Sequence, residues 1–540
     1  MKRFLSIALL LCLSSLSLGA QNTLYWGGEV ISPANMSHME AAKYAQKENS
    51  HLSARVSAMG GAFTSLGADL SSMAINPAGL GMYRTSQLSI SSEFDTTHST
   101  NNTSYDGTAS NFSFNQLGAA LNIYQGSGAL LSFTLGFAYN KVADLNFTNR
   151  AGWDNGAVTI GEFFAEQMYG INPADLGSTA TPFTNSNIST DQWGGVLAYR
   201  TYMIDPDMQE DKFMGSYFVG SIPTENFVNS GLTMKSRGRV EEYDFSMGFN
   251  FGNILYLGTT LGITGIEQTI AYTYHERYVG AQGEDMESMD FKPFVANYGS
   301  GVNVKIGAIL RPVSAVRLGI AYHSPTRVSL TRDYDAMMTT SFNTKTSYQA
   351  HSYINTYTYD YSSPSKLLLG ASVSIADKAL LSVDYDKVWY GNMRMNSHDY
   401  NMANAFADDV AADLGTAENF RVGVEIHPTK DLYVRGGYAF YGSPLNSDAT
   451  RYNDEGGTFY GTYKTHCDNY SLGLGWRFAS GSSLDLVWTL SRAHYTNSIM
   501  YDYFYENADS GEQIFVSGPT QMNTKHTSNT IGLTYSVLLF

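Results

Sequence analysis

The chain has 540 residues, 15% of them charged and 13% aromatic, with 38 tyrosines and a net charge of −16. This charged fraction is well below the roughly 25% of soluble domains. The strongly acidic balance argues against binding nucleic acid, and against binding anionic membrane surfaces by charge. So many tyrosines suit a protein with two boundaries between water and apolar surroundings, because the ring and the hydroxyl favour different sides.

The first 20 residues have the composition of a secretory signal peptide. Lys2 and Arg3 precede an apolar stretch over residues 4–16, and the small residues Gly19 and Ala20 follow. Cleavage after Gly19 and cleavage after Ala20 both stay open. Export to an oxidising compartment follows from either.

The two cysteines are Cys12 and Cys467. A lipoprotein anchor at Cys12 is disfavoured, because Leu11 stands where a small residue is expected. Cys12 leaves with the signal peptide, so no intramolecular disulfide is expected in the mature chain.

Beyond residue 20 no apolar run approaches the roughly 20 residues that a transmembrane helix needs. A mature chain embedded in a membrane must therefore be a β-barrel, since only helices and closed barrels satisfy every backbone polar group in lipid. We divide the chain into a signal peptide (1–20), an N-terminal periplasmic or hatch segment (21–86) and an outer-membrane β-barrel with long extracellular loops (87–540).

Residues 21–86 do not alternate, and they precede the first predicted strand, so they must lie in the periplasm, plug the barrel, or both. Small residues are frequent from Ala54 to Gly67, and the string Asn76-Pro77-Ala78-Gly79-Leu80 follows. This segment resembles the N-terminal hatch of the FadL-type family, the outer-membrane transporters of long-chain fatty acids and other hydrophobic compounds. The resemblance covers the hatch at motif level and the rest of the chain only in architecture.

The resemblance implies that Asn76, Pro77, Ala78 and Gly79 belong to a gate in a hatch that plugs a fourteen-stranded barrel. It also implies passive, hatch-gated uptake of a hydrophobic small molecule, and an inward kink in the third strand, for which Gly136 is the candidate. The residue types agree with this role, because proline fixes φ and asparagine hydrogen-bonds to nearby backbone. For the string alone, the alternative is an ordinary surface turn.

From Gln87 onward many segments alternate with period two, as strands between lipid and water must. In the last of them Ile531, Leu533 and Tyr535 alternate with Gly532 and Thr534. We predict an all-β fold, a transmembrane antiparallel β-barrel of about fourteen strands with an N-terminal hatch plugging the lumen. The strands are expected to start near Gln87, Phe112, Ala129, Thr233, Ile254, Asn297, Ala315, Tyr353, Ala379, Asn419, Leu432, Asn469, Ser483 and His526.

The connections between these strands are alternately short and long, which is the outer-membrane pattern. The short ones are Gly252-Asn253, Arg311-Pro312, Ala376-Asp377, His427-Pro428 and Ser480-Gly481. A soluble β-sandwich would also alternate, but its strands need no tyrosine and tryptophan at their ends.

The final strand carries a second signal. Thr530, Gly532, Tyr535 and Val537 follow a spacing that resembles the signal read by barrel-assembly machinery, and the chain ends on the aromatic Phe540. We therefore expect that machinery, and the lipid of the bacterial outer membrane, as partners.

The long connection from Thr148 to Gly231 contains a short amphipathic helix. Its apolar residues Ile160, Phe163, Phe164 and Met168 recur at helical spacing. This face either packs on other loops or docks a hydrophobic ligand, as the resemblance implies. A second apolar group, in the connection after the ninth strand, has the same two interpretations and consists of Met393, Met395 and Met402.

No catalytic constellation emerges, and we expect no enzyme, no cofactor and no metal site. Asp384 and Asp386 are predicted to face the lumen and keep it hydrated, and the 11 histidines lack metal-ligand spacing. Two alternative functions stay open. A haem or porphyrin receptor is favoured by His398 among methionines, and a structural or adhesive surface barrel by the long acidic loops. The natural ligand, lateral or periplasmic release, and the oligomeric state are not determined by these patterns.

Overall fold

The structure is a computed structural model, and it describes residues 25–26, 29–30, 36–46, 51–103, 105–176, 182–184, 187–209, 212–220, 227–376, 378–397, 400–446, 464–495, 502–506, 513–517 and 524–539. The predicted signal peptide, His398 and Phe540 lie outside these residues.

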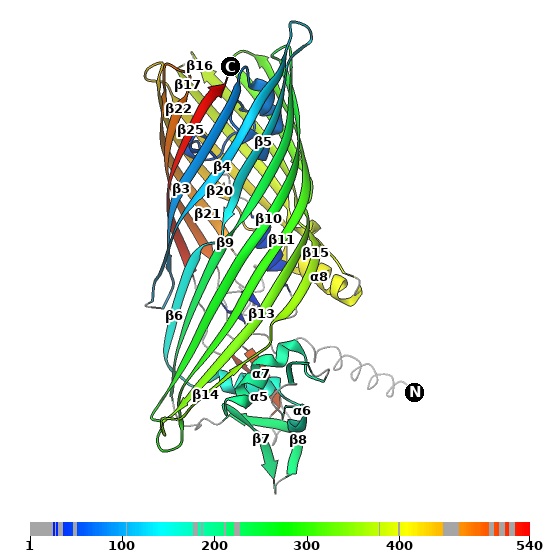
Figure 1. Ribbon diagram of the computed structural model, residues 1–540, viewed down its shortest axis with the longest axis vertical. Coiled ribbons are helices and arrows are strands. Elements are labelled where there is room, and N and C mark those ends of the chain that lie inside the picture. Colours follow the sequence, from blue (N-terminus) through cyan, green and yellow to red (C-terminus); the bar gives the residue numbers. More distant parts are fainter. Residues whose placement is uncertain are drawn as a thin grey trace.

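One antiparallel sheet closes on itself to form a barrel (Figure 1). It has fourteen wall strands, as predicted, and four of them are interrupted once. In chain order they are β3 (Ser86–Thr100), β4 (Gly107–Gln125), β5 (Leu130–Asp144) continued by β6 (Phe147–Gly156), β9 (Phe227–Phe251), β10 (Leu255–Val279), β11 (Met286–Val313), β12 (Val316–His323) continued by β13 (Arg327–Phe342), β15 (Asn355–Ser362) continued by β16 (Ser365–Ile375), β17 (Ala379–Trp389) continued by β18 (Arg394–Asn396), β19 (Thr416–Ile426), β20 (Leu432–Tyr441), β21 (Lys464–Arg477), β22 (Ser483–Tyr495) and β25 (Thr524–Leu539).

The first and last wall strands, β3 and β25, close the barrel in register from Leu539 beside Ser86 to Lys525 beside Thr100. The short β14 (Ser347–His351) pairs with β13. Three small two-stranded sheets are separate from the barrel sheet and consist of β1 (Tyr25–Trp26) with β2 (Glu29–Val30), β7 (Ile204–Gln209) with β8 (Lys212–Gly220), and β23 (Asp502–Glu506) with β24 (Gln513–Ser517).

The helices are short, and Figure 1 shows α5, α6 and α7 at the end of the barrel opposite the C-terminus and α8 at its side. They are α2 (His38–Ala45), α3 (Ala54–Ala58), α4 (Ser72–Ile75), η2 (Pro77–Met82), α5 (Ile160–Gln167), α6 (Pro173–Leu176), η3 (Pro182–Thr184), η4 (Thr190–Gln192), α7 (Trp193–Arg200), η5 (Tyr390–Asn392) and α8 (Tyr400–Asp413). Among the described residues, none of these helices has the length and apolar composition to cross a membrane.

Along the wall strands, the apolar side chains change from the outer face to the inner face. Near its start, β10 exposes Leu257, Leu261 and Ile263 on the outside, whereas Thr260 and Thr264 are buried inside. Further along the same strand the order is reversed. Apolar side chains from Ile266 to Tyr278 are buried inside, and the outer positions from Glu267 to Arg277 are mostly polar. The apolar belt therefore covers only the part of the barrel next to the short turns.

Three neighbouring wall strands project far beyond this belt. β9 and β10 each have 25 residues and β11 has 28, whereas a strand that only spans lipid needs about 9–11. Figure 1 shows these strands, flanked by β6 and β13, reaching past the rest of the barrel, at the end opposite the C-terminus. We assign that end to the cell exterior, because the short turns lie at the other end, and short turns of outer-membrane barrels face the periplasm.

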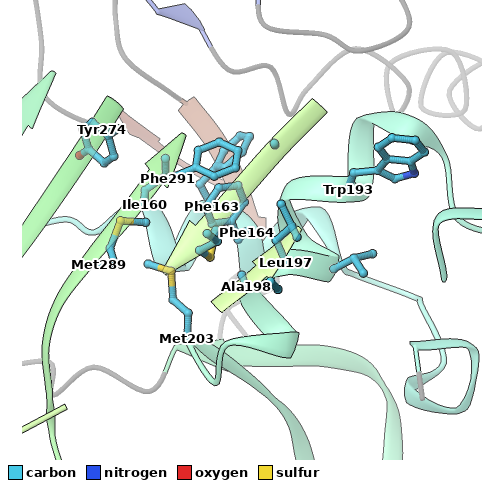
Figure 2. Packing of buried hydrophobic residues seen from close by; sticks show 14 of the residues in the cluster. Ile160, Phe163, Phe164, Trp193, Leu197, Ala198, Met203, Tyr274, Met289 and Phe291 are labelled. Carbon is cyan, nitrogen blue, oxygen red and sulfur yellow. The ribbon is translucent and has the colours of Figure 1, made fainter. Parts of the chain in front are cut away.

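A set of loop helices, the extracellular cap (residues 159–204), covers the inner face of the projecting strands. Its apolar core joins α5 and α7 to side chains of β10 and β11, with Phe164 packed edge-to-face on Phe291 (Figure 2). Helix α5 begins where Glu276 of β10 accepts hydrogen bonds from the Thr159 hydroxyl (2.6 Å) and the Ile160 backbone N–H (2.9 Å).

The connection predicted from Thr148 to Gly231 is wrong at its start. Residues Phe147–Gly156 form β6, which pairs with β9 from Phe147 beside Ser236 onward. The wall therefore continues where the sequence predicted a loop, because the outer positions of β6 are polar and give no alternating lipid-facing signal.

Candidate functional site: the luminal segment and two cavities

Residues 51–83, here called the luminal segment, lie within the barrel and pack on its inner wall. Its turns are capped locally. The Ser53 side chain accepts a hydrogen bond from the Val56 N–H at the start of α3, and Asn76 caps η2, in which Pro77 is the first residue. Proline is favoured there because its missing N–H would have no helical partner.

Asn76 joins three parts of the structure. Its side-chain oxygen accepts a hydrogen bond from the Ala78 N–H (3.1 Å), and its side-chain N–H₂ donates to the Thr64 carbonyl (2.7 Å). The same N–H₂ group lies 3.3 Å from the carbonyls of Ala308 in β11 and Ile320 in β12. Asn76, Pro77, Ala78 and Gly79 are all buried, so this string is not an exposed surface turn.

A ring of glycines lets the luminal segment approach the wall. At nine inward positions a side chain would collide with residues 58–81. A methyl group at Gly258 would meet Pro77, and one at Gly307 would meet Asn76. The nine are Gly136, Gly248, Gly258, Gly307, Gly319, Gly370, Gly423, Gly437 and Gly473, each on a different wall strand. Backbone thus lies against backbone around much of the barrel.

Asp384 fills the place in this ring where β17 carries no glycine. One of its carboxylate oxygens accepts hydrogen bonds from the N–H groups of Phe63 and Thr64 (both 2.8 Å) and from the Thr64 hydroxyl (2.7 Å). Asp386 instead forms a two-point ion pair with Arg421 (2.5 and 2.6 Å) and lies 3.0 Å from Lys366. Both aspartates face the lumen as predicted, but both are buried against the luminal segment or the wall, and neither lines open water.

The wall has a break between β4 and the β5/β6 strand. Ladder pairs run from Gln125 and Ser132 to Gln116 and Asn140, with one register shift between Asn122 and Tyr124. Beyond that last pair, the described residues contain no further pair between β4 and β5 or β6. Further along, Gly107 of β4 lies against Thr148 of β6, and Asn101 of the β3–β4 connection donates to the Arg150 carbonyl (2.5 Å).

The predicted kink at Gly136 is not where the wall breaks. Gly136 is paired on both sides, with Ala120 and with Ser246, and it makes room for Met73 and Leu80 of the luminal segment. The interruption lies at residues 145–146, after a register shift between Lys141 and Ala143. A glycine permits a kink but does not cause one. Here the wall breaks because β5 is no longer paired with β4 beyond Asn140.

A buried ion cluster spans the break on the inner side. The Lys141 ammonium of β5 contacts Glu93 and lies 3.4 Å from Asp95, both on β3, and 2.8 Å from Asp144. It also donates to the Ser113 hydroxyl of β4 (2.9 Å). Lys141 thus reaches over the inner face of β4. Its ion pairs join β5 to β3 where β5 and β4 have no ladder pairs.

His51 of the luminal segment adjoins this cluster, with Nδ1 3.1 Å from Glu93. His51, Glu93 and Asp95 are close enough to share a metal ion, but the Lys141 ammonium already contacts both carboxylates. This grouping was missed in the sequence, because the four residues are brought together by three separate segments. The available signal was Lys141, a charge at a position that alternation directs towards lipid.

The first cavity lies deep in the lumen between α2, the luminal segment and the wall, and it encloses about 1100 Å³ including its open mouth. Its apolar lining includes Tyr44, Leu52, Val142, Ile266 and Tyr361. Helix α2 forms one side, fixed by Glu40 to Arg332 (2.6 Å) and by Tyr44 to Gln268 (2.7 Å).

Charged side chains also line the first cavity, and each has a partner. Lys305 contacts Glu242 (2.7 Å) and Asp244 (2.8 Å), and Lys366 contacts Asp386. His323 donates from Nε2 to the Ile75 carbonyl of the luminal segment (2.8 Å). The cavity lining thus has an apolar part and a polar part, and the charges of the polar part are paired with one another.

The predicted docking face on α5 is not exposed. Ile160, Phe163, Phe164 and Met168 are all fully buried in the core of the extracellular cap (Figure 2). The packing alternative therefore accounts for this helix, because the projecting strands present an apolar inner face that must be covered. Met393 and Met395 are likewise buried in a core shared with α2 and α8.

Comparison with known proteins identifies similar folds. No protein-family model and no curated protein sequence matches the chain. Similar solved structures include the toluene transporter TodX of P. putida (11% identity, 90% of this chain and 97% of that chain, TM-score 0.46). A FadL homologue of Pseudomonas aeruginosa (11%, 90% and 98%, TM-score 0.48) and the toluene transporter TbuX of Ralstonia pickettii (12%, 91% and 98%, TM-score 0.45) are also similar. At these identities the similarity concerns the fold.

Proposed function

We propose that this protein is a passive transporter in the bacterial outer membrane that takes up long-chain fatty acids or similar hydrophobic small molecules, without enzymatic activity. The observation that carries the proposal is the first cavity, an apolar chamber inside a barrel whose direct path to the periplasm is occupied by the luminal segment. A water-filled pore for polar solutes would need an open path instead.

In this proposal the luminal segment is the hatch, and Asn76, Pro77, Ala78 and Gly79 are its gate. Asn76 contacts both the hatch and two wall strands, so a shift of η2 must break its bonds to Ala308 and Ile320. Ligand uptake is driven by removing apolar surface from water, about 25 cal/mol per Å².

We place the exit at the wall break between β4 and β5/β6. Val142 lines the first cavity and is one residue from Lys141, so the chamber and the break are adjacent. The Lys141 cluster closes the break, and lateral release into the bilayer requires it to separate. The haem-receptor alternative rests on His398, and a Soret shift on adding haem would favour it.

Uptake of a radiolabelled long-chain fatty acid into proteoliposomes tests this function. Ile266→Asp places a carboxylate in the chamber wall and should lower saturable uptake about tenfold or more, because an unpaired charge in an apolar site is costly. Thr269→Asp, which adds the same charge to the outer face of β10, is the matched control. Equal uptake by parent, Ile266→Asp and empty liposomes would overturn the proposal.

A further inference from the structure

A second cavity, of about 910 Å³ including its open mouth, lies inside the barrel next to the wall break. Its lining contains the β5/β6 residues from Ala143 to Phe147, and it shares Gln46 with the lining of the first cavity. Any molecule that passes from the first cavity to the break lies next to this second space.

The second cavity has a different chemistry from the first. Five hydroxyl side chains line it from three adjacent wall strands, and these are Thr97, Thr489, Ser491, Ser528 and Thr530. The Thr97 and Ser528 hydroxyls lie 2.7 Å apart, and Thr530 donates to Asp95. A purely apolar ligand here would cover these groups without offering hydrogen bonds in return.

The lining also does not select for an anionic headgroup. Asp95 and Asp144 both line the cavity and already contact the Lys141 ammonium. Lys43 lies over the ring of Phe147, 5.3 Å from its centroid. A carboxylate entering this cavity would meet these two carboxylates as well as Lys43 and His51, so the lining offers no excess of positive charge and hydrogen bonding is favoured over attraction to it.

Three aromatic rings line one side of the second cavity. His526 lies with its centroid 5.0 Å from Phe147 and 4.7 Å from Tyr495. An aromatic surface beside hydroxyls and carboxylates suits a sugar or polyol, because the C–H faces of such a molecule pack on rings while its hydroxyls both donate and accept hydrogen bonds.

We propose that the second cavity binds the uncharged, hydroxyl-rich headgroup of an amphipathic ligand whose apolar tail occupies the first cavity. This inference rests on the proposed function and narrows its substrate class from hydrophobic compounds in general to molecules with a sugar-like or polyol head. The aromatic rings and the Thr97–Ser528 pair hold the head, and Gln46 marks the junction with the tail.

The test measures binding of three ligands with the same tail to the full-length protein in lipid nanodiscs, by equilibrium dialysis with empty nanodiscs subtracted. The ligands are monomeric octyl β-glucoside, 1-octanol and octanoate. Octyl β-glucoside should bind at least about tenfold more tightly than either of the others, since its head forms two or more new hydrogen bonds.

The double variant Thr97→Val, Ser528→Ala should abolish this preference while leaving 1-octanol binding unchanged. The matched control is Thr331→Val, Thr358→Val, which removes a similar hydroxyl pair (3.3 Å) from the exposed outer face of β13 and β15. Equal affinity of the parent for octyl β-glucoside and 1-octanol would overturn the headgroup site and leave the transport proposal standing, as would a preference that survives in the double variant. A parent that binds none of the three overturns both.

Discussion

The carboxylate of Asp384 accepts hydrogen bonds from both the backbone N–H and the hydroxyl of Thr64, and so ties the middle of the luminal segment to β17. Both groups are buried, and hydrogen bonds to a charged group contribute about 1.5–3 kcal/mol each. Asp384 is therefore one of the side chains that hold the luminal segment in place, together with Asn76 and His323.

We predict that Asp384→Ala loosens the luminal segment without unfolding the barrel. Openings of the pore should become at least about tenfold more frequent, since a loss of 1.4 kcal/mol corresponds to a factor of ten. Conductance of single molecules in planar bilayers measures this. Asp360→Ala, on the exposed outer face of β15, is the control and should stay as silent as the parent. A silent Asp384→Ala variant would mean that the remaining contacts suffice.

Deleting residues 54–80 should leave a barrel that still migrates differently before and after boiling, because every strand from β3 onward keeps its neighbours. The pore should become a steady channel, and saturable fatty-acid uptake should fall because the first cavity loses one wall. Asn76→Ala should give a milder form of both effects, as it loses only side-chain hydrogen bonds. If the deletion changes neither conductance nor uptake, the segment is not a gate.

Phe163→Asp should destabilise the extracellular cap and not the barrel. The Phe163 side chain is fully buried, and replacing it removes an aromatic contact and adds an unpaired charge, together costing about 3–5 kcal/mol or more. Limited proteolysis should cut the connection between β6 and β9 much faster in this variant. Tyr169→Asp is the control, since Tyr169 is 50% exposed. Similar cleavage of the two variants would contradict the packing role of α5.

Lys141→Met should weaken the ion cluster that closes the wall break, because Glu93, Asp95 and Asp144 lose their shared cation. Removing one partner of a buried pair costs about 3–5 kcal/mol. Hydrogen exchange at β5 residues 141–144 should accelerate, with no change in the regular ladder around Gly136. Adding Glu93→Gln and Asp95→Asn should restore slow exchange. Failure of that rescue would show that packing, and not charge, closes the break.

The fold was predictable from the sequence where the apolar face points to lipid. The alternation near the short turns predicted the closed barrel and its fourteen strands, because the lumen there is polar and the outside is apolar. The projecting parts were not predicted. From Ile266 onward in β10 the apolar side chains face inward and pack on the cap. In this part of the strand the apolar face of the alternation is therefore the inner face, and not the lipid-facing one.

The candidate site was predictable only where neighbours in sequence are neighbours in space. Asn76 and Pro77 cap and start η2 within one string, so the motif carried its own geometry. The contacts of Asp384 with Thr64 and of Lys141 with Glu93 join residues far apart in the chain. Their partners depend on the register of the closed sheet, which periodicity does not fix.

The ring of nine glycines has a consequence for biogenesis. Residues 58–81 lie so close to nine wall strands that not even a methyl group fits between them, and they precede β3 in the chain. Threading such a segment into a finished barrel would require that wall to widen against its own hydrogen bonds. We therefore expect the opposite order of events, in which the wall strands assemble one after another around the luminal segment. The pairing of β3 with β25 then closes the barrel last.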